Sequence, residues 1–110
     1  MSTERHLLQP GAPVLTTVVN LLADPYDVYI GRPGRGRDGS FGNPFRIGPH
    51  GSRAQVLERF QQYFRHRLAT DPAFRHRVEA LRGKRLGCFC KPLACHGDII
   101  ADHVNSGGVA

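Results

Sequence analysis

The fold is decided by the stretch Lys84-Arg85-Leu86-Gly87-Cys88-Phe89-Cys90-Lys91-Pro92-Leu93-Ala94-Cys95-His96-Gly97-Asp98, near the end of the chain. Its first seven residues predict a strand, which Pro92 ends. Apolar side chains at positions 99, 100 and 104 then predict a helix over residues 96–104. All three cysteines of the chain therefore lie where the last strand turns into the C-terminal helix.

Two helices are expected before this segment. Ser52 with Gln55 three residues later has the pattern of a capping box, and predicts a helix that reaches Leu68. Asp71 and Pro72 then begin a second helix, with Asp as N-cap and Pro at the first helical position. Its apolar face extends to Gly83, where it is expected to end. The core positions are Val56, Phe60, Tyr63, Phe64 and Leu68 in the first helix, and Phe74, Val78 and Leu81 in the second.

The first half of the chain is expected to supply the rest of the sheet. β-Branched residues predict a strand at residues 14–21, and a short apolar run predicts another at 26–30. A further extended piece is expected at 44–47. We therefore predict one α/β domain over residues 14–105, with a three- to four-stranded sheet and about three helices. Residues 1–13 are expected to be a flexible lead-in and residues 106–110 a frayed tail.

Composition narrows the class of protein. A chain of 110 residues supports one hydrophobic core. It has no apolar run near the roughly 18 residues needed to cross a bilayer and no basic-then-apolar leader, so we expect no membrane partner and a cytoplasmic location. An odd, tightly spaced set of cysteines argues against a disulfide scaffold and predicts reduced thiols.

The net charge of +6, which comes mainly from arginine, favours an anionic partner. The guanidinium fork matches phosphate and carboxylate oxygens in pairs, so a nucleotide, a sugar phosphate or nucleic acid are natural candidates. An arginine-rich genome would produce part of the same excess.

Strand alternation and topology predict a pocket. Side chains of Leu86, Cys88 and Cys90 should share one strand face, while Cys95 and His96 lie in the turn that opens the last helix. If the strands are parallel, the loop after residue 30 opens onto the same sheet edge, where α/β proteins bind ligands. We therefore expect a pocket between residues 31–43 and 90–98.

The favoured interpretation of this pocket is a site for a phosphate-bearing or nucleotide-like ligand. Cys95 would be a thiolate activated at a helix N-terminus, because unpaired backbone amides lower a thiol pKa there. His96 and Asp98 would complete the proton transfers if the protein is an enzyme. The expected ligand-binding residues are Gly31, Arg32, Pro33, Gly34, Asn43, Pro44 and Cys90.

Two alternatives use the same residues differently. Cys88, Cys90, Cys95 and His96 form a Cys3His set by count, which suits tetrahedral zinc. Against zinc, all four fall within nine residues, and adjacent Cys95 and His96 point apart if both are helical. Alternatively, free cysteines are often core residues, and this is the better interpretation of Cys88.

A different class of function is nucleic-acid binding. Basic and aromatic side chains occur together in the first half of the chain, where they could track a backbone and stack bases. These residues are Arg35, Arg37, Arg46 and Arg53, with Tyr29, Phe41 and Phe45 nearby.

Three motifs of the chain carry a resemblance to a known family. They are Asp-Val-Tyr-Ile-Gly-Arg-Pro at 27–33, Phe-Gly-Asn-Pro-Phe at 41–45, and Cys-Phe-Cys-Lys-Pro-Leu-Ala-Cys-His-Gly-Asp at 88–98. With these, the chain resembles the small bacterial and phage proteins of domain-of-unknown-function family 4326. The resemblance implies a small α/β fold and a shared site, with no established activity.

Residues 35–39 look like a local extension relative to the family pattern. The end of the chain is also similar to a second uncharacterised family, whose Cys-x-Glu and Cys-His-Arg motifs occupy a similar strand-to-helix turn. Cys90 here stands where that family has an acid.

Overall fold

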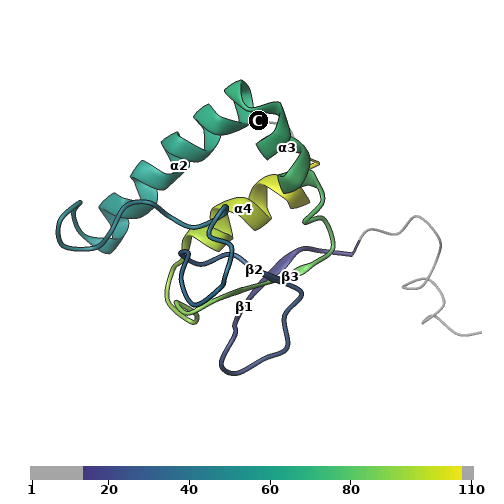
Figure 1. Ribbon diagram of the computed structural model, residues 1–110, viewed down its shortest axis with the longest axis horizontal. Helices are drawn as coiled ribbons and strands as arrows, with labels where there is room; N and C mark the ends of the chain where they lie inside the picture. The colour runs from purple at the N-terminus through teal and green to yellow at the C-terminus, as the bar shows by residue number, and fades with distance from the viewer. Residues whose placement is uncertain (1–13, 108–110) are drawn as a thin grey trace, which may run out of the picture.

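The computed structural model describes residues 14–107 and has three strands and three named helices within that range (Figure 1). The α/β class is confirmed. In chain order the elements are β1 (Thr17–Asn20), β2 (Val28–Tyr29), α2 (Arg53–Thr70), α3 (Pro72–Glu79), β3 (Arg85–Cys88) and α4 (His96–Asn105).

The sheet has β3 at its centre, with β1 and β2 on either side. Both pairs are parallel, and Leu86 of β3 lies opposite Val18 of β1 and Val28 of β2. Parallel strands present their carboxyl ends at one edge, so the loop after β2 and the turn after β3 leave the sheet together. The condition for a shared pocket is therefore met.

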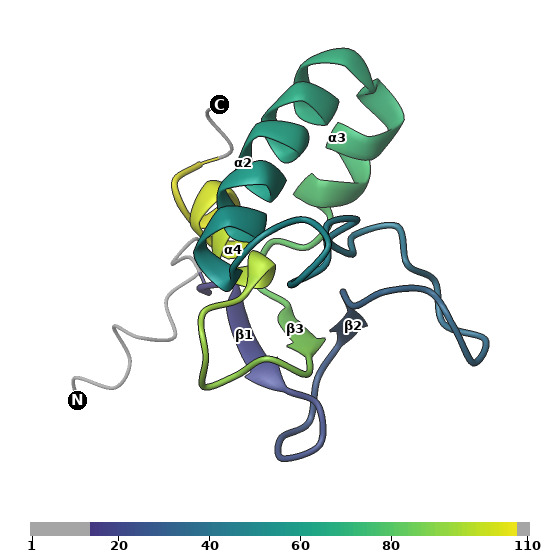
Figure 2. The same ribbon diagram turned by 90° about the vertical axis from the view of Figure 1, so that its left-hand side faces the viewer.

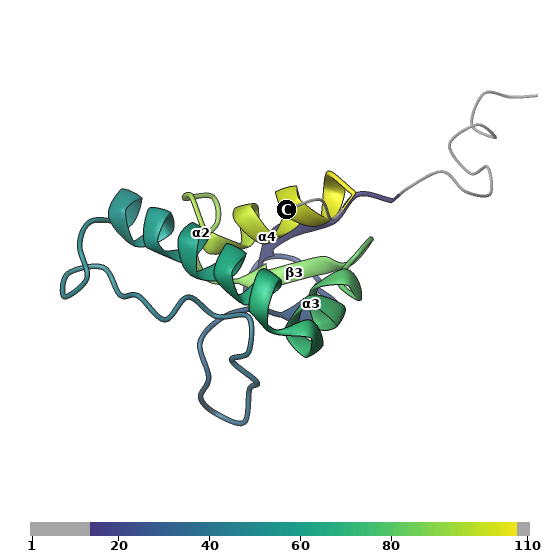
Figure 3. The same cartoon turned by 90° about the horizontal axis from the view of Figure 1, so that it is seen from above.

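The sheet is smaller than the upper limit of the prediction, because residues 44–47 form no strand. The backbone amide of Phe45 donates to the side-chain Oδ1 of Asn43 at 2.9 Å, which makes a local turn in place of a ladder bond. Figure 3 shows residues 31–52 as a long irregular connection on its way to α2. The strand expected at 84–90 also ends early, at Cys88, so Cys90 lies in the following turn.

The helices cover one face of the sheet. Helix α4 lies between the sheet and the α2–α3 pair, as Figures 1 and 2 show. Ile30, Leu86, Ile100 and Val104 are fully buried where α4 meets the sheet. The stacked rings of Phe60 and Phe64 from α2, with centroids 5.7 Å apart, continue the same core.

Capping hydrogen bonds begin helices α2 and α3, as expected. Ser52 and Gln55 form the reciprocal capping box of α2, with bonds of 3.2 and 2.8 Å. Asp71 accepts from the amide of Phe74 at 3.1 Å and caps α3. The expected end of this helix at Gly83 is wrong, because the chain tightens after Glu79 into successive turns.

Three remaining expectations concern the ends of the chain and the membrane. The flexible lead-in at residues 1–13 and the last three residues of the expected tail lie outside the described residues. Helix α4 ends at Asn105, whose side chain makes two hydrogen bonds to the backbone of Thr16. Within residues 14–107, no helix combines the length and the hydrophobicity that a membrane span requires.

Candidate functional site

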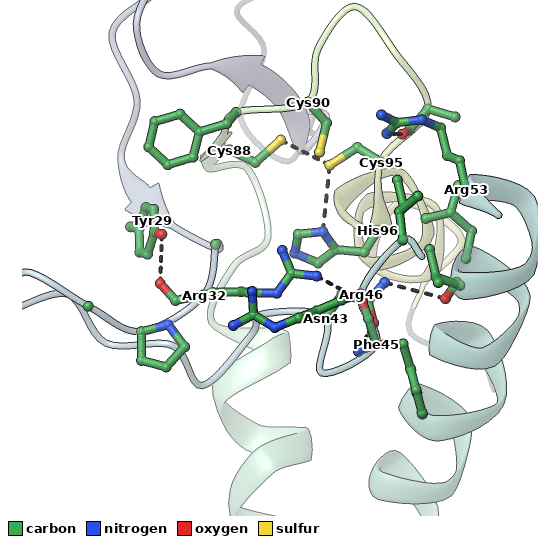
Figure 4. Close-up of a pocket in the computed structure, with 18 of the residues that line it drawn as sticks. Tyr29, Arg32, Asn43, Phe45, Arg46, Arg53, Cys88, Cys90, Cys95 and His96 are labelled. Carbon is green, nitrogen blue, oxygen red and sulfur yellow. Dashed lines mark hydrogen bonds between the residues drawn. The ribbon is translucent and has the colours of Figure 1, made fainter. Parts of the chain in front are cut away.

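A cavity of about 780 Å³ opens at the carboxyl edge of the sheet (Figure 4). Its walls come from the connection between β2 and α2, from the start of α2, and from the turn between β3 and α4. The structure thus brings the two segments of the predicted pocket, residues 31–43 and 90–98, around one space.

Five arginine side chains line this cavity, and none of the lining residues in the described range is acidic. Two of the five are oriented by backbone carbonyls. Arg32 Nη2 donates to Phe45 O at 2.8 Å, and Arg53 Nη1 donates to Ala94 O at 3.0 Å. A concave surface lined by one sign of charge attracts anions. We call these five residues the pocket arginines: Arg32, Arg35, Arg37, Arg46 and Arg53.

A cluster of three thiols forms the opposite wall, which we call the thiol cluster. Cys88 ends β3, Cys90 lies in the turn, and Cys95 is the N-cap of α4. Their Sγ atoms lie within 4.8 Å of one another, and those of Cys88 and Cys95 are 2.9 Å apart. Cys88 also packs in the hydrophobic core, as expected. Three cysteines this close together could hold a metal ion.

The ring of His96 lies beside the thiol cluster with a defined orientation. Its Nε2 lies 2.7 Å from the carbonyl oxygen of Ile30, and since a carbonyl only accepts, Nε2 carries the proton. Nδ1 therefore presents its lone pair, 3.7 Å from Cys95 Sγ. Burial lowers the pKa of His96, which favours the neutral ring.

Cys95 and His96 were expected to point apart if both are helical, and that condition is not met. Cys95 is the N-cap, with φ −144° and ψ 151°, so its backbone is extended and only His96 is helical. The Cys95 side chain folds back over the start of α4, where it accepts from the amide of Gly97 at 3.3 Å. Both side chains consequently face the cavity.

The two buried thiols have opposite pKa shifts. A hydrogen bond from the Cys95 thiol lowers the pKa of Cys88 to about 6. Burial opposes this decrease in pKa, and the backbone amides of Cys90 and Lys91 add to it. The same hydrogen bond and burial raise the pKa of Cys95. The amide of Gly97 acts against this increase, as expected at a helix start, but is the smaller effect. These directions favour ionisation of Cys88 over Cys95. The part of Cys95 as an activated thiol stays a prediction.

Residues 18–106 match the family model described as Domain of unknown function (DUF4326). The chain belongs to DUF4326. It is 41% identical over 91 residues to the "Uncharacterized 12.4 kDa protein in nrdA-td intergenic region" of Enterobacteria phage T4, which covers 83% of this chain and 79% of that protein. No solved structure matches.

The family resemblance inferred from the sequence is thus confirmed, and the structure shows what its motifs share. Motifs at 27–33, 41–45 and 88–98 come from three separate places in the chain, and each contributes residues to the cavity. The motifs that resemble other DUF4326 proteins therefore converge on one site. Neither the family description nor the phage relative's name states an activity.

Asp98 lies in the first turn of α4 and does not line the cavity. One carboxylate oxygen accepts from the backbone amide of Cys95 at 3.1 Å, and the other pairs with Lys91 Nζ at 2.5 Å. This hydrogen bond raises the pKa of Lys91. In this position Asp98 closes the turn between Cys90 and Cys95, while its proposed part in proton transfer stays a prediction.

The expected ligand-binding residues of the first loop divide into two groups. Gly31, Arg32, Pro33 and Gly34 line the cavity, and Pro44 does not. Asn43 lines it, but the two polar atoms of its amide already serve the protein. Nδ2 donates to the carbonyl of Val56 on α2 and Oδ1 accepts from the following loop, so the side chain holds the loop against the helix.

Phe89 was missed as a ligand-contacting residue, and Arg53 was expected only in the nucleic-acid alternative. Arg53 belongs to α2 and reaches the cavity through a contact 41 residues away in the chain, which no local pattern reveals. Phe89 lies between two cysteines and lines the cavity, and the residue is 51% exposed. The indication in the sequence was that Phe89 is an aromatic residue near the end of a strand that leads into the predicted pocket.

Proposed function

We propose that this DUF4326 protein binds an anionic, phosphate-bearing small molecule in the cavity between the pocket arginines and the thiol cluster. The observation that carries the proposal is the lining, which has five arginines and no acidic residue in the described range. The cavity, about 780 Å³, falls in the size range of small-molecule sites. Guanidinium groups bind phosphate oxygens in pairs, through charge-assisted hydrogen bonds.

The guanidinium groups retain donors for a ligand. Arg32 and Arg53 each give one Nη atom to a carbonyl, which orients the group and leaves its other nitrogens available. Among the described residues, the side chains of Arg35 and Arg46 make no ion pair or hydrogen bond. A ligand with more than one negative charge is the best match to this set.

Calorimetric titration with inorganic pyrophosphate tests the proposal. We expect Arg46→Gln to weaken binding by about tenfold or more, since a hydrogen bond to a charged group typically contributes about 1.5–3 kcal/mol. Arg65→Gln is the matched control, because Arg65 is an exposed arginine of α2 outside the cavity. Equal weakening by both variants, or no binding at low salt, would contradict an anion site in this cavity.

A second candidate function is zinc binding by Cys88, Cys90, Cys95 and His96. What favours it is the orientation of His96, which places an unprotonated Nδ1 3.7 Å from Cys95 Sγ, one of the three clustered sulfurs. With Zn–S about 2.3 Å and Zn–N about 2.1 Å, a tetrahedral site has S–S edges of about 3.8 Å and S–N edges of about 3.6 Å. The Cys95–His96 separation of 3.7 Å fits this geometry.

Zinc binding would require a movement of two thiols and would produce a closed site. The Sγ atoms of Cys88 and Cys95, now 2.9 Å apart, would separate by about 1 Å to reach a tetrahedral edge. The Ile30 carbonyl already accepts from the outer nitrogen of His96, as a carbonyl or carboxylate usually does for a zinc-bound histidine. Four protein ligands close a site, so such a zinc ion would brace the cavity wall and leave no position for water.

The zinc proposal competes with a catalytic use of Cys95, in which His96 and Asp98 would assist proton transfer. Elemental analysis of protein purified without a metal-affinity step separates them, together with Cys95→Ser. Stoichiometric zinc that is lost in Cys95→Ser would reject the free nucleophile. A metal-free, folded protein whose pyrophosphate binding weakens in Cys95→Ser would reject zinc. Either use needs reduced thiols, and on that ground we propose a cytoplasmic location.

A further inference from the structure

We infer that the ligand of the cavity is a nucleotide, whose base stacks on Phe89 and Arg37 while its phosphates contact the other pocket arginines. This inference rests on the proposed anion site and adds the part of the ligand that is not a phosphate. It is carried by the placement of two aromatic rings and one guanidinium at one side of the cavity.

The aromatic rings are Tyr29 and Phe89, which both line the cavity. Their centroids lie 6.5 Å apart, with the ring planes at 75°. Phe89 follows the buried Cys88 but keeps half of its own surface exposed. Figure 4 shows Tyr29 at the left of the pocket, well apart from Arg53 and Phe45 on the right. The cavity therefore has an apolar, aromatic side in addition to its charged sides.

Arg37 lies over both rings. Its guanidinium carbon is 4.9 Å from the centroid of Tyr29 and 5.7 Å from that of Phe89. Arginine and aromatic faces are the two kinds of surface on which proteins stack nucleobases. A flat base that reaches this group of three side chains meets both kinds of surface.

The backbone holds Arg37 in this place. Gly34 and Arg37 exchange two hydrogen bonds of 2.9 and 3.4 Å, and the residues between them, Arg35 and Gly36, have φ of +52° and +78°. Positive φ at both central positions is the mark of a type I′ hairpin turn. An ion pair of 2.9 Å between Asp38 and Arg77 then fastens the loop to α3. The hairpin spans residues 34–37 and so includes part of the segment 35–39, which the sequence analysis expects to be a local extension.

The chemistry distinguishes a nucleotide from simpler anions. A sugar phosphate or an inorganic phosphate has no planar ring to contact Phe89 and Arg37, whereas a nucleotide engages this corner and the charged walls together. A single-stranded nucleic acid offers the same two groups. A bounded cavity favours a mononucleotide over a strand, which binds along a continuous basic groove.

Calorimetry with inorganic pyrophosphate and with the 5′-diphosphates of adenosine, guanosine, cytidine and uridine tests the inference. We expect at least one nucleoside diphosphate to bind about tenfold or more tightly than pyrophosphate, which is within the range measured for base stacking. Phe89→Leu and Arg37→Gln should remove this advantage, while Phe89→Tyr should keep it. Because Phe89 lies between two cysteines, metal content is measured for every variant and has to match the wild type.

The outcomes separate the inference from the function on which it rests. If pyrophosphate binds as tightly as every nucleoside diphosphate, or if both Phe89→Leu and Arg37→Gln keep the nucleotide advantage, the inference is wrong and the anion site stands. If no probe binds, both are wrong. If a ten-residue single strand binds more tightly than any mononucleotide, with affinity that falls steeply with salt, a nucleic-acid site replaces the inference.

Discussion

His96 donates from Nε2 to the carbonyl oxygen of Ile30, a residue 66 positions earlier in the chain, at 2.7 Å. This hydrogen bond joins the start of α4 to the residue that follows β2, and the walls of the cavity begin at these two places. It also settles which ring nitrogen carries the proton, so that Nδ1 faces the Sγ of Cys95 at 3.7 Å. One backbone carbonyl thus orients the only buried imidazole among the cavity residues of the described chain.

The first prediction tests His96 as a metal ligand. With cobalt(II) as a spectroscopic substitute for zinc, His96→Gln should weaken metal binding by at least tenfold, because a nitrogen donor is lost from the coordination shell. His96→Cys should restore tight binding, with a visible spectrum altered toward all-sulfur ligation. An unchanged affinity and spectrum in His96→Gln would show that the imidazole is not a ligand.

A second prediction concerns the close approach of α4 to the sheet at Gly97. A Cβ atom at this position would lie 2.6 Å from Cδ1 of Ile30 and 3.0 Å from Cγ1 of Val18. Gly97→Ala should therefore lower the free energy of unfolding by about 1–3 kcal/mol, as overpacking does, although alanine favours helix. Urea denaturation measures this change. The exposed substitution Asp102→Ala in the same helix should stay within about 0.5 kcal/mol of the wild type.

Equal stability of Gly97→Ala and the wild type would mean that α4 has room to move away from the sheet. In that case the position of Cys95 and His96 at the start of α4 would be less strictly determined than the contacts of Gly97 indicate.

Arg35 gives a third prediction, because it adopts φ of +52° in the hairpin that positions Arg37. Left-handed backbone is unfavourable for arginine, while Asn followed by Gly is the preferred pair in a type I′ turn. Arg35→Asn should raise the free energy of unfolding by about 0.5–1 kcal/mol. Arg35→Val should lower it, since a β-branched residue suits this conformation poorly. Denaturation curves in which the two variants shift alike would contradict the turn.

His103 gives a prediction about pH. Burial lowers its pKa, with Arg82 acting in the same direction and Glu79 in the opposite one. A histidine whose folded pKa lies below its unfolded value stabilises fully above about pH 6.5 and loses that contribution as the pH falls. His103→Gln should therefore lose less stability than the wild type between pH 7 and pH 5. Parallel losses in urea denaturation at the two pH values would contradict this role.

Much of the fold could be predicted from local chemistry. Ser52 and Asp71 cap their helices through hydrogen bonds that span three residues, and such short-range patterns can be read from the sequence. The pocket prediction assumed that the strands are parallel and did not derive it, because strand pairing on β3 depends on contacts between distant segments. The strand expected at 44–47 failed because Asn43 captures the amide of Phe45, a competition that β propensity does not describe.

The candidate site was predictable in its position and less so in its geometry. Segment positions followed from the rule that ligand sites of α/β proteins lie at the carboxyl ends of strands. The orientation of the Cys95 side chain did not follow from any such rule. Cys95 is the N-cap, one residue before the helix begins, and its extended backbone turns the side chain toward His96. The contribution of Arg53 depends on tertiary packing between α2 and the turn that contains Ala94.

The measurement that tests the central claim most directly is a ¹H–¹⁵N NMR titration of the protein with inorganic pyrophosphate, followed through the arginine Nε–Hε signals. An anion site predicts saturable shifts in the pocket arginines and in the backbone amides of residues 94–97, with signals of arginines outside the cavity such as Arg65 and Arg85 unmoved. Shifts spread evenly over all arginines, or absent from the pocket arginines, would contradict it.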